Sequence, residues 1–244
     1  MKTLKNIYVL ALLALTTVSC GLDNYDAPES KLHGQVVYKD ANGVEHAIGV
    51  RGTGEAVRLK LYQYGYELKD GIDVFLTQNA QFESVLFDGE YHLVPQKDNG
   101  PWKTIQVSEA KKDTIDFVLK GTTTLKVYVL PYYMLYNSAI RFDGTTFTAT
   151  CDIEKVISDA AVDQVGLFVS TTQFVDESSN FIRKDYGRQQ PGSGQQFELT
   201  VTDENQKKAI DLARSRTGKV YARIGLKPAG SDQYVYSDVQ EIRL

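Results

Sequence analysis

Short runs of alternating apolar and polar residues, broken by turn residues, repeat along most of this chain. In the run VRLKLYQYGY (57–66), every second residue from Val57 to Leu61 is apolar. Successive side chains of a strand point to opposite faces of a sheet, so this run predicts a strand with one apolar face. The other face would carry three aromatic rings, those of Tyr62, Tyr64 and Tyr66.

Comparable runs divide the chain into two sets of about seven short strands, in residues 31–120 and 121–244. Turn signals separate the strands, including Asn42-Gly43, and Asp88-Gly89 in the run QFESVLFDGEYHLV. Fifteen tyrosines and ten phenylalanines, against two methionines, also favour β structure. The pattern predicts an all-β fold of two tandem β-sandwich domains.

A helical pattern interrupts the second set. The run ENQKKAIDLARSR (204–216) follows Asp203, a suitable N-cap, and precedes Gly218, a suitable stop. Four residues form its predicted apolar stripe, namely Ala209, Ile210, Leu212 and Ala213. We therefore expect one short helix, and a long polar loop over residues 174–196.

The first nineteen residues have the composition of a secretory signal peptide. Two lysines precede a short apolar core, and small residues lead to Cys20. This arrangement resembles the bacterial lipoprotein signal, which implies an acylated Cys20; secretion after cleavage nearby is the alternative. Residues 20–30 are polar and predict a flexible tether. Acidic residues shortly after the cysteine resemble the pattern for export to the outer face of the outer membrane.

Charge and cysteine content exclude several functions. The net charge is −4, and loss of residues 1–19, which carry two lysines and no acid, leaves −6. This balance argues against a nucleic-acid partner and against basic membrane docking, so we expect membrane contact through the lipid anchor only. Cys151 would be the remaining thiol, which excludes an intrachain disulfide and a cysteine metal cluster.

The sequence offers few groups for catalysis. His33, His46 and His92 lack the spacing that places two imidazoles on one metal ion. The chain contains no nucleophile elbow, phosphate-binding loop or dinucleotide fingerprint. Turn formation already accounts for acidic residues such as Asp88 and Asp143, each of which precedes a glycine. The Asn-Gly hairpin turn accounts in the same way for Asp40, Asn42 and Glu45, whose spacing is otherwise reminiscent of a calcium loop. We expect no enzyme activity, cofactor or metal; an enzyme with an unrecognised site would instead need a cleft with two carboxylates of raised pKa.

Exposed aromatic rings are the better candidate for a site, because sugar rings stack on them while amides and carboxylates bind the hydroxyls. Three clusters qualify. The candidate ligand-binding residues are Tyr62, Tyr64 and Tyr66, then Trp102 in the turn-rich KDNGPW, then Tyr132, Tyr133 and Tyr136 in PYYMLYN. The alternative is structural, since tyrosines also cover domain seams and core edges.

Two segments carry a resemblance to known families. QFESVLFDGEYHLV resembles carboxypeptidase-regulatory-like and transthyretin-like sandwiches. KVYARIGLKPAGSDQYVYS is similar to the end of immunoglobulin-like and fibronectin type III domains. Together with the lipoprotein signal and NGPW (99–102), they resemble two-domain Bacteroidota-type surface lipoproteins of unknown function.

That resemblance implies a role beside starch-utilisation-type systems. Such lipoproteins accompany TonB-dependent outer-membrane transporters and substrate-capture lipoproteins. We therefore expect a non-enzymatic, lipid-anchored protein on the outside of the outer membrane that assists capture and uptake of polysaccharide or oligosaccharide. The second domain is the expected place of contact. A fimbrial or adhesin-type subunit, trimmed by a protease near Lys31 or Lys39 before assembly, is the alternative.

Overall fold

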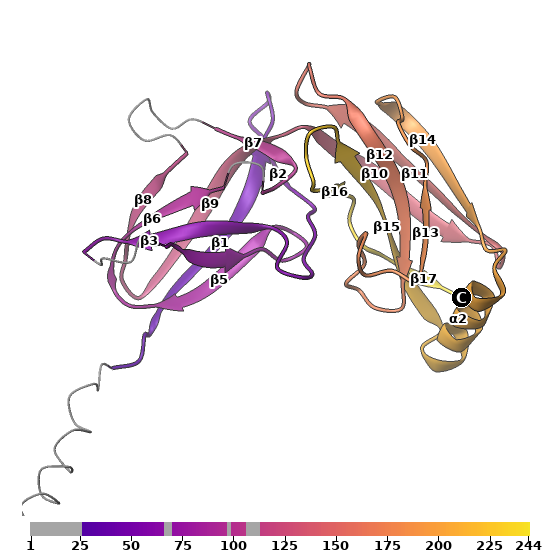
Figure 1. Ribbon diagram of the computed structural model, residues 1–244, viewed down its shortest axis with the longest axis horizontal. Helices are drawn as coiled ribbons and strands as arrows, with labels where there is room; N and C mark the ends of the chain where they lie inside the picture. Colours follow the sequence, from indigo (N-terminus) through magenta and orange to yellow (C-terminus); the bar gives the residue numbers. More distant parts are fainter. Residues whose placement is uncertain (1–25, 66–69, 97–98, 106–112) are drawn as a thin grey trace, which may run out of the picture.

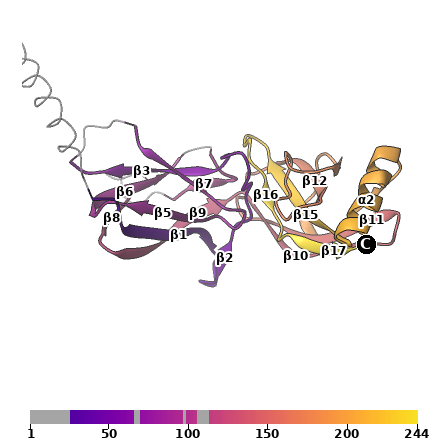
Figure 2. The ribbon, with the colours of Figure 1, turned by 90° about the horizontal axis from the view of Figure 1, so that it is seen from below.

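The structure, a computed structural model, describes residues 26–65, 70–96, 99–105 and 113–244. Figure 1 shows two β domains joined end to end, and Figure 2 shows the same arrangement after a turn of 90° about the long axis. The predicted all-β fold of two tandem sandwich domains with one short helix is confirmed for the described residues. No helix in those ranges has the length and hydropathy needed to cross a membrane.

The first domain consists of two facing sheets. The strands are β1 (Ser30–Lys39), β2 (Glu45–Ala47), β3 (Arg58–Gln63), β4 (Ile72–Phe75), β5 (Gln81–Leu86), β6 (Gly89–Pro95), β7 (Trp102–Thr104), β8 (Ile115–Leu119) and β9 (Thr122–Pro131). One sheet has the order β2-β1-β9-β7, with β5 also paired to β1, and the other has the order β4-β3-β6-β8. Alternating residues such as Leu32, Leu59 and Leu93 are buried between them.

The two predicted turns of the first domain are present, but one of them joins strands of different sheets. Asn42-Gly43 closes the hairpin of β1 and β2, where Gly43 has φ +84°. Asp88-Gly89 does turn the chain between β5 and β6. However, β5 pairs with β1 whereas β6 pairs with β3 and β8, so this turn carries the chain from one sheet to the other.

The boundary expected between residues 120 and 121 is corrected by the strand pairing. β9 runs parallel to β1, with Lys31 opposite Thr122, and antiparallel to β7. It therefore completes the first domain, and the second domain begins with β10 at Tyr133. The sequence pattern missed this because a parallel strand pair joins segments about 90 residues apart and leaves no local turn signal.

The second domain also has two sheets. Its elements are β10 (Tyr133–Phe142), β11 (Thr146–Lys155), β12 (Val162–Ser170), β13 (Ile182–Asp185), β14 (Gly192–Thr200), α2 (Glu204–Arg216), β15 (Lys219–Pro228), β16 (Val235–Tyr236) and β17 (Gln240–Arg243). The sheets have the orders β10-β11-β14 and β13-β12-β15-β16, with β17 also paired to β15. The expected loop over 174–196 is therefore wrong in part, since it contains β13 and the start of β14.

The helix α2 lies at the end of the molecule farthest from the first domain (Figures 1 and 2). The Asp203 carboxylate caps it by accepting hydrogen bonds from two first-turn amides, as predicted. Ile210 and Ala213 are buried, whereas Leu212 is 49% exposed, so the apolar stripe is narrower than the sequence suggests. The helix therefore closes one end of the sandwich and leaves the end near the first domain open to other contacts.

Candidate functional site

Within the predicted tyrosine row, Tyr62 lies on the outer face of β3, as strand alternation predicts, whereas β3 ends at Gln63 and Tyr64 lies in the turn that follows. Tyr62 stacks on the His92 ring at 4.8 Å between ring centroids, and its ring also lies against Gly71, where an added Cβ would meet the ring at 2.8 Å. Tyr64 is 48% exposed and donates a hydrogen bond to Asp116 at 3.3 Å. Tyr62 is covered by His92 and Gly71, whereas Tyr64 keeps a large accessible surface. Tyr66 lies outside the described residues, as does Cys20.

Two of the predicted aromatic residues are buried and unavailable to a ligand. Trp102 is 3% exposed, because β7 pairs with the end of β9 and turns the indole inward over Gly100. Tyr133 is 1% exposed, and its burial raises the pKa of its hydroxyl. The assignment of these residues to a surface site is therefore corrected. Trp102 lies in a turn-rich sequence and Tyr133 opens β10, and both side chains belong to the core.

The remaining two candidates lie near the junction of the domains. Tyr132 is partly buried beneath the Lys103 ammonium, which lies 5.9 Å from the ring centroid. Tyr136 is half-buried and meets His46 of the first domain edge to face, with 5.3 Å between ring centroids. Burial, followed by the charge of Glu154, raises the pKa of Tyr136. Tyr136 is thus the predicted residue that the structure brings against another domain.

A cleft of about 450 Å³ opens at this junction. Strand β2 and the turn before β5 form one wall, and β10 with the segment around β16 forms the other. The side chains that matter here combine aromatic, amide and carboxylate groups: Glu45, His46, Asn79, Tyr136, Asn137 and Asp238. Concave sites between domains that hold a few convergent polar groups are the usual binding sites of proteins.

Hydrogen bonds hold the polar groups of the cleft in place. Glu45 accepts a hydrogen bond from the Tyr128 hydroxyl at 2.7 Å and pairs with Lys126. His46 lies 3.0 Å from Asp40 between Nε2 and Oδ2. These partners lower the pKa of the Glu45 and Asp40 carboxyl groups, with the bonds from Lys126 and His46 contributing most. Both carboxylates are therefore ionised and fixed acceptors at neutral pH.

The second wall of the cleft is fixed in the same way. Asn137 adopts a left-handed conformation, with φ +49°, where the pairing of β10 with β11 is irregular. Its side-chain amide donates to Asp152 at 2.6 Å, and this bond lowers the pKa of the aspartate. The bulge therefore turns β10 at the rim of the cleft, next to Tyr136.

A close backbone contact joins the domains beside the cleft. Gly49 of the first domain bridges Tyr236 of β16, and the Tyr236 amide donates to the Gly49 carbonyl at 2.9 Å. A Cβ at position 49 would lie 2.2 Å from the Tyr236 carbonyl oxygen. Glycine at this position is thus what allows the two backbones to approach.

A buried polar network surrounds that bridge. Arg223 is 1% exposed, its guanidinium lies 3.8 Å from the Tyr236 ring centroid, and it donates to the Val50 carbonyl at 3.2 Å. The Tyr236 hydroxyl donates to Glu177, whose carboxylate also pairs with Arg51 at 2.9 Å. We call this set the interdomain joint; it consists of Gly49, Arg51, Thr53, Asp176, Glu177, Arg223 and Tyr236, with Thr53 donating to Asp176 at 2.5 Å.

Burial sets the protonation of the joint. It lowers the pKa of Arg223 to about 10, so the guanidinium is still charged at neutral pH. Burial also raises the pKa of Tyr236 well above its usual range, and the neighbouring Glu177 carboxylate adds to this effect. Tyr236 therefore stays a hydrogen-bond donor, and the joint remains intact over the physiological pH range.

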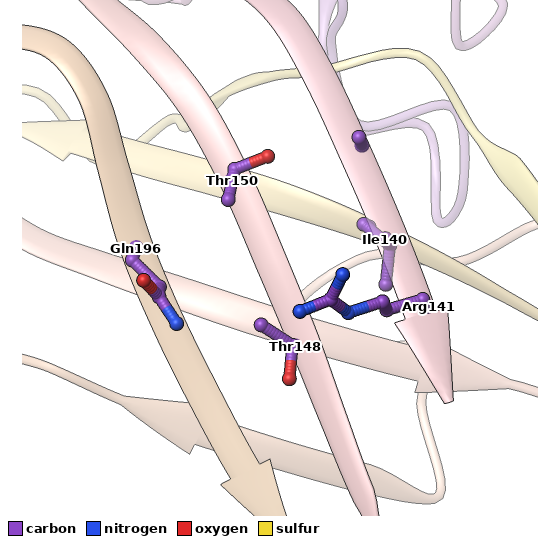
Figure 3. Close-up of a pocket in the computed structure, with 6 residues that line it drawn as sticks. Ile140, Arg141, Thr148, Thr150 and Gln196 are labelled. Carbon is purple, nitrogen blue, oxygen red and sulfur yellow. The ribbon is translucent and has the colours of Figure 1, made fainter. Parts of the chain in front are cut away.

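A smaller depression, of about 160 Å³, lies on the exposed face of the β10-β11-β14 sheet (Figure 3). Arg141 extends from β10 toward Thr148 of β11, and Thr150 and Gln196 lie beside them. The described residues that line it include no aromatic ring. It offers hydrogen-bonding groups without a stacking surface, so we place the candidate site in the interdomain cleft.

Most residues of the cleft and the joint carry no local signal in the sequence. Glu45 and His46 follow a hairpin turn, and Asn79 and Asp238 lie in short connections, where polar residues are ordinary. Arg223 alternates with apolar residues of β15, a pattern typical of a side chain that faces away from the core. Among the residues that line the cleft, Tyr136 is one that the aromatic pattern of the sequence did predict as ligand-binding.

Comparisons with known proteins agree with this architecture. Residues 30–130 match the family model described as "Protein of unknown function (DUF3823) N-terminal domain", and residues 133–241 match "Domain of unknown function (DUF3823_C)". Both limits agree with the domain boundary between β9 and β10. No curated protein matches the chain.

Solved structures show the same fold over most of the chain. A DUF3823 family protein from Parabacteroides merdae is 37% identical, with a TM-score of 0.76, and the match covers 89% of this chain and all of that one. A second, from Bacteroides ovatus, is 25% identical, with a TM-score of 0.71 over 88% and 99% of the two chains. A "putative carbohydrate binding protein" from Bacteroides uniformis is 16% identical, with a TM-score of 0.68 over 89% and 100%, a likeness that shows the fold alone. Because both domain models match in order and a solved member is similar along its full length, this chain belongs to the DUF3823 family.

Proposed function

We propose that this protein is a non-enzymatic lipoprotein of the outer-membrane surface that binds polysaccharide in the interdomain cleft and assists its uptake. The observation that carries the proposal is the convergence of aromatic rings and fixed polar groups at the junction of the domains. Tyr136 and His46 supply the rings, and Glu45, Asn79 and Asp238 supply acceptors and donors. The cleft draws on both domains, so the proposed contact includes the first domain as well as the second, where we expected it.

The chemistry of a sugar suits this arrangement. A sugar ring has apolar C–H faces that gain from contact with an aromatic ring, and hydroxyl groups that need hydrogen bonds when they leave water. Glu45 and Asp40 are already held by their own partners, so binding costs little additional ordering of these side chains. A prearranged cleft of this kind favours a ligand with many hydroxyl groups.

The charge state of the carboxylates supports a role without catalysis. A glycoside hydrolase needs a carboxylic acid of raised pKa opposite a second carboxylate. The pKa of Glu45 and that of Asp40 are instead lowered by hydrogen bonds, so neither group is a proton donor at neutral pH.

A lipid anchor at Cys20 would make weak binding useful. It would hold the cleft close to the membrane, where an outer-membrane transporter and its substrate-capture lipoprotein act on the same polymer. Tethering raises the effective concentration of a captured chain near such partners. The carbohydrate-binding description of the Bacteroides uniformis protein agrees with this role, although that likeness shows the fold alone.

Affinity electrophoresis of the mature protein, without its lipid, tests the proposal. The gels contain soluble starch, xylan, mixed-linkage β-glucan or galactomannan. We expect one of them to retard the protein, and Asn79→Ala and Tyr136→Ala to abolish most of that retardation. Asn205→Ala, an exposed asparagine on α2, is the matched control and should migrate like the wild type.

Two further variants separate the competing locations. Tyr136→Phe keeps the ring against His46 and should retain most binding if stacking dominates. Tyr64→Ala removes the exposed tyrosine of the turn after β3 and should have no effect. Loss of binding in Tyr64→Ala with full binding in Asn79→Ala would move the site to the outer face of the first domain. Absence of retardation by every polysaccharide would reject direct capture.

The fimbrial or adhesin-type alternative makes a different prediction. Trimming at Lys31 or Lys39 would cut β1, whose Leu32 and Val36 are fully buried and which pairs with three other strands. A protease reaches such a strand only after local unfolding. We expect no polymer ladder after limited trypsin treatment of the folded protein, and a ladder would favour the assembly role.

A further inference from the structure

A second polar depression lies on the outer face of the first domain. It has a volume of about 420 Å³ and lies over β5, β1 and β9. The residues that line it and carry the argument are His33, Gln35, Gln81, Glu83, Thr124 and Lys126. Their neighbours Leu32, Phe82 and Val127 point into the core, so strand alternation directs the polar set toward solvent.

Two contacts connect this depression with the interdomain cleft. Lys126 lines the depression and pairs with Glu45, which lines the cleft. Gln35 lines the depression, and its side-chain amide donates to the backbone carbonyl of Asn79, which lines the cleft, at 3.1 Å. Since each contact joins a residue of one hollow to a residue of the other, the two hollows adjoin.

The two hollows differ in chemistry. The cleft has aromatic rings at Tyr136 and His46 together with amides and carboxylates. The depression has mainly hydroxyl, amide and charged groups; of the two rings among its described lining residues, the His33 imidazole is 37% exposed and the Phe82 ring is 4% exposed. Each hydrogen bond to these groups contributes about 1 kcal/mol. The depression, which we call the arm of the site, would therefore strengthen the binding of a chain that the cleft already holds.

We infer that the ligand is the interior of an extended, uncharged polysaccharide chain that runs from the interdomain cleft onto the outer face of β5, β1 and β9. This inference rests on the proposed function and specifies its ligand. Both hollows are open to solvent and adjoin at the Lys126–Glu45 and Gln35–Asn79 contacts, so a chain can pass from one to the other without an end being enclosed. Charged groups of both signs occur along the path, since Lys126 pairs with Glu45 and Glu83 lies 3.8 Å from His33, and this mixture favours hydroxyl groups over a uniformly charged polymer.

Binding as a function of chain length tests the inference. The probes are malto-, xylo-, cello- and manno-oligosaccharides of two to eight units, measured by isothermal titration calorimetry with the mature wild-type protein. For the series that binds, we expect the affinity to rise by about tenfold or more between the shortest and the longest members, because the longer ones add hydrogen bonds on the arm.

Variants of the arm give the decisive comparison. Gln81→Ala with Thr124→Val removes two exposed polar groups and keeps the strand pairing. We expect this double variant to weaken the longest oligosaccharide by about fivefold to tenfold and to leave the shortest binder unchanged. Asn79→Ala should weaken both, and Asn205→Ala neither.

Each outcome has a distinct meaning. If the shortest binder has the same affinity as the longest, or if the arm variant leaves the longest unaffected, the extended mode is overturned while the proposed glycan binding stands. If sulfated or uronate-containing chains bind more tightly than neutral ones, the uncharged class is overturned. If no oligosaccharide or polysaccharide binds, the proposed function itself fails and this inference with it.

Discussion

Removal of Arg223 should destabilise both domains, although the residue belongs to the second. Arg223 is 1% exposed, stacks on Tyr236 and donates across the junction to the Val50 carbonyl. In Arg223→Met, an unbranched apolar side chain occupies the site, while Glu177 and Asp176 keep their charges. The variant therefore removes the central cation of the joint without emptying its volume.

The magnitude follows from the contacts that are lost. A hydrogen bond from a charged donor contributes about 1.5 to 3 kcal/mol, and a desolvated cation–π contact about 2 kcal/mol. Breaking a buried charged network by removing one member costs about 3 to 5 kcal/mol. For a chain of this size, that loss lowers the melting temperature by roughly 10 °C.

Trp102 makes the interdomain part of the effect measurable. It is the only tryptophan of the chain and lies in the core of the first domain, whereas Arg223 lies in β15 of the second. Denaturant unfolding followed by tryptophan fluorescence therefore reports the first domain. We expect its midpoint to shift in Arg223→Met together with the midpoint followed by far-UV circular dichroism.

Two controls define what would refute this reasoning. Arg243→Met removes an exposed arginine of β17 and should change stability by no more than about 0.5 kcal/mol. Arg223→Lys keeps the charge but loses the planar face, and should show an intermediate loss. An unchanged fluorescence midpoint in Arg223→Met would mean that the joint does not couple the two domains, and an unchanged melting temperature would remove the energetic argument altogether.

Three other predictions concern packing and titration. Gly34→Ala would place a Cβ 2.1 Å from the Phe82 ring, so overpacking should cost about 1 to 3 kcal/mol in denaturant unfolding; the additional change Phe82→Leu should recover part of the loss, and an unchanged single variant would contradict the packing. The Cys151 thiol is 1% exposed, and burial raises its pKa to about 12, so a mature protein that lacks Cys20 should react with a disulfide reagent at pH 8 only after unfolding; rapid labelling of the folded protein would contradict this burial. Burial raises the pKa of Tyr136, Tyr186 and Tyr236, so these hydroxyl groups ionise at a lower pH in the unfolded chain than in the fold. The free energy of unfolding should therefore fall as the pH rises above about 10. Denaturant midpoints measured at about pH 8 and above about pH 10 test this, and a higher midpoint at the higher pH would contradict it.

Local sequence determined the class of fold and several of its turns. Alternation around Leu59 and Leu61, the Asn42-Gly43 turn and the Asp203 cap act over a few residues, so the pattern specifies them directly. The same alternation correctly placed Tyr62 on the outer face of β3, although the strand ends at Gln63, before Tyr64. It did not show that Tyr62 would be covered by His92 and Gly71, because those contacts come from other strands.

Tertiary structure decided which strands meet and which aromatic residues remain accessible. β9 joins β1 in parallel, a pairing between distant segments that assigns residues 122–131 to the first domain. β7 pairs with the end of β9 and thereby turns Trp102 into the core. Neither outcome has a local signal, because register between distant strands depends on the packing of the whole sheet.

The cleft and the joint were decided at the same level. Arg223 alternates with the core residues of β15, so its side chain points away from the core of the second domain, and Tyr236 and the Val50 carbonyl of the first domain contact it there. Likewise, His46 and Tyr136 are about 90 residues apart and meet only because the domains dock at Gly49. Sequence patterns encode which face of a strand is apolar, whereas the docking of two finished domains determines which polar and aromatic side chains converge on a site.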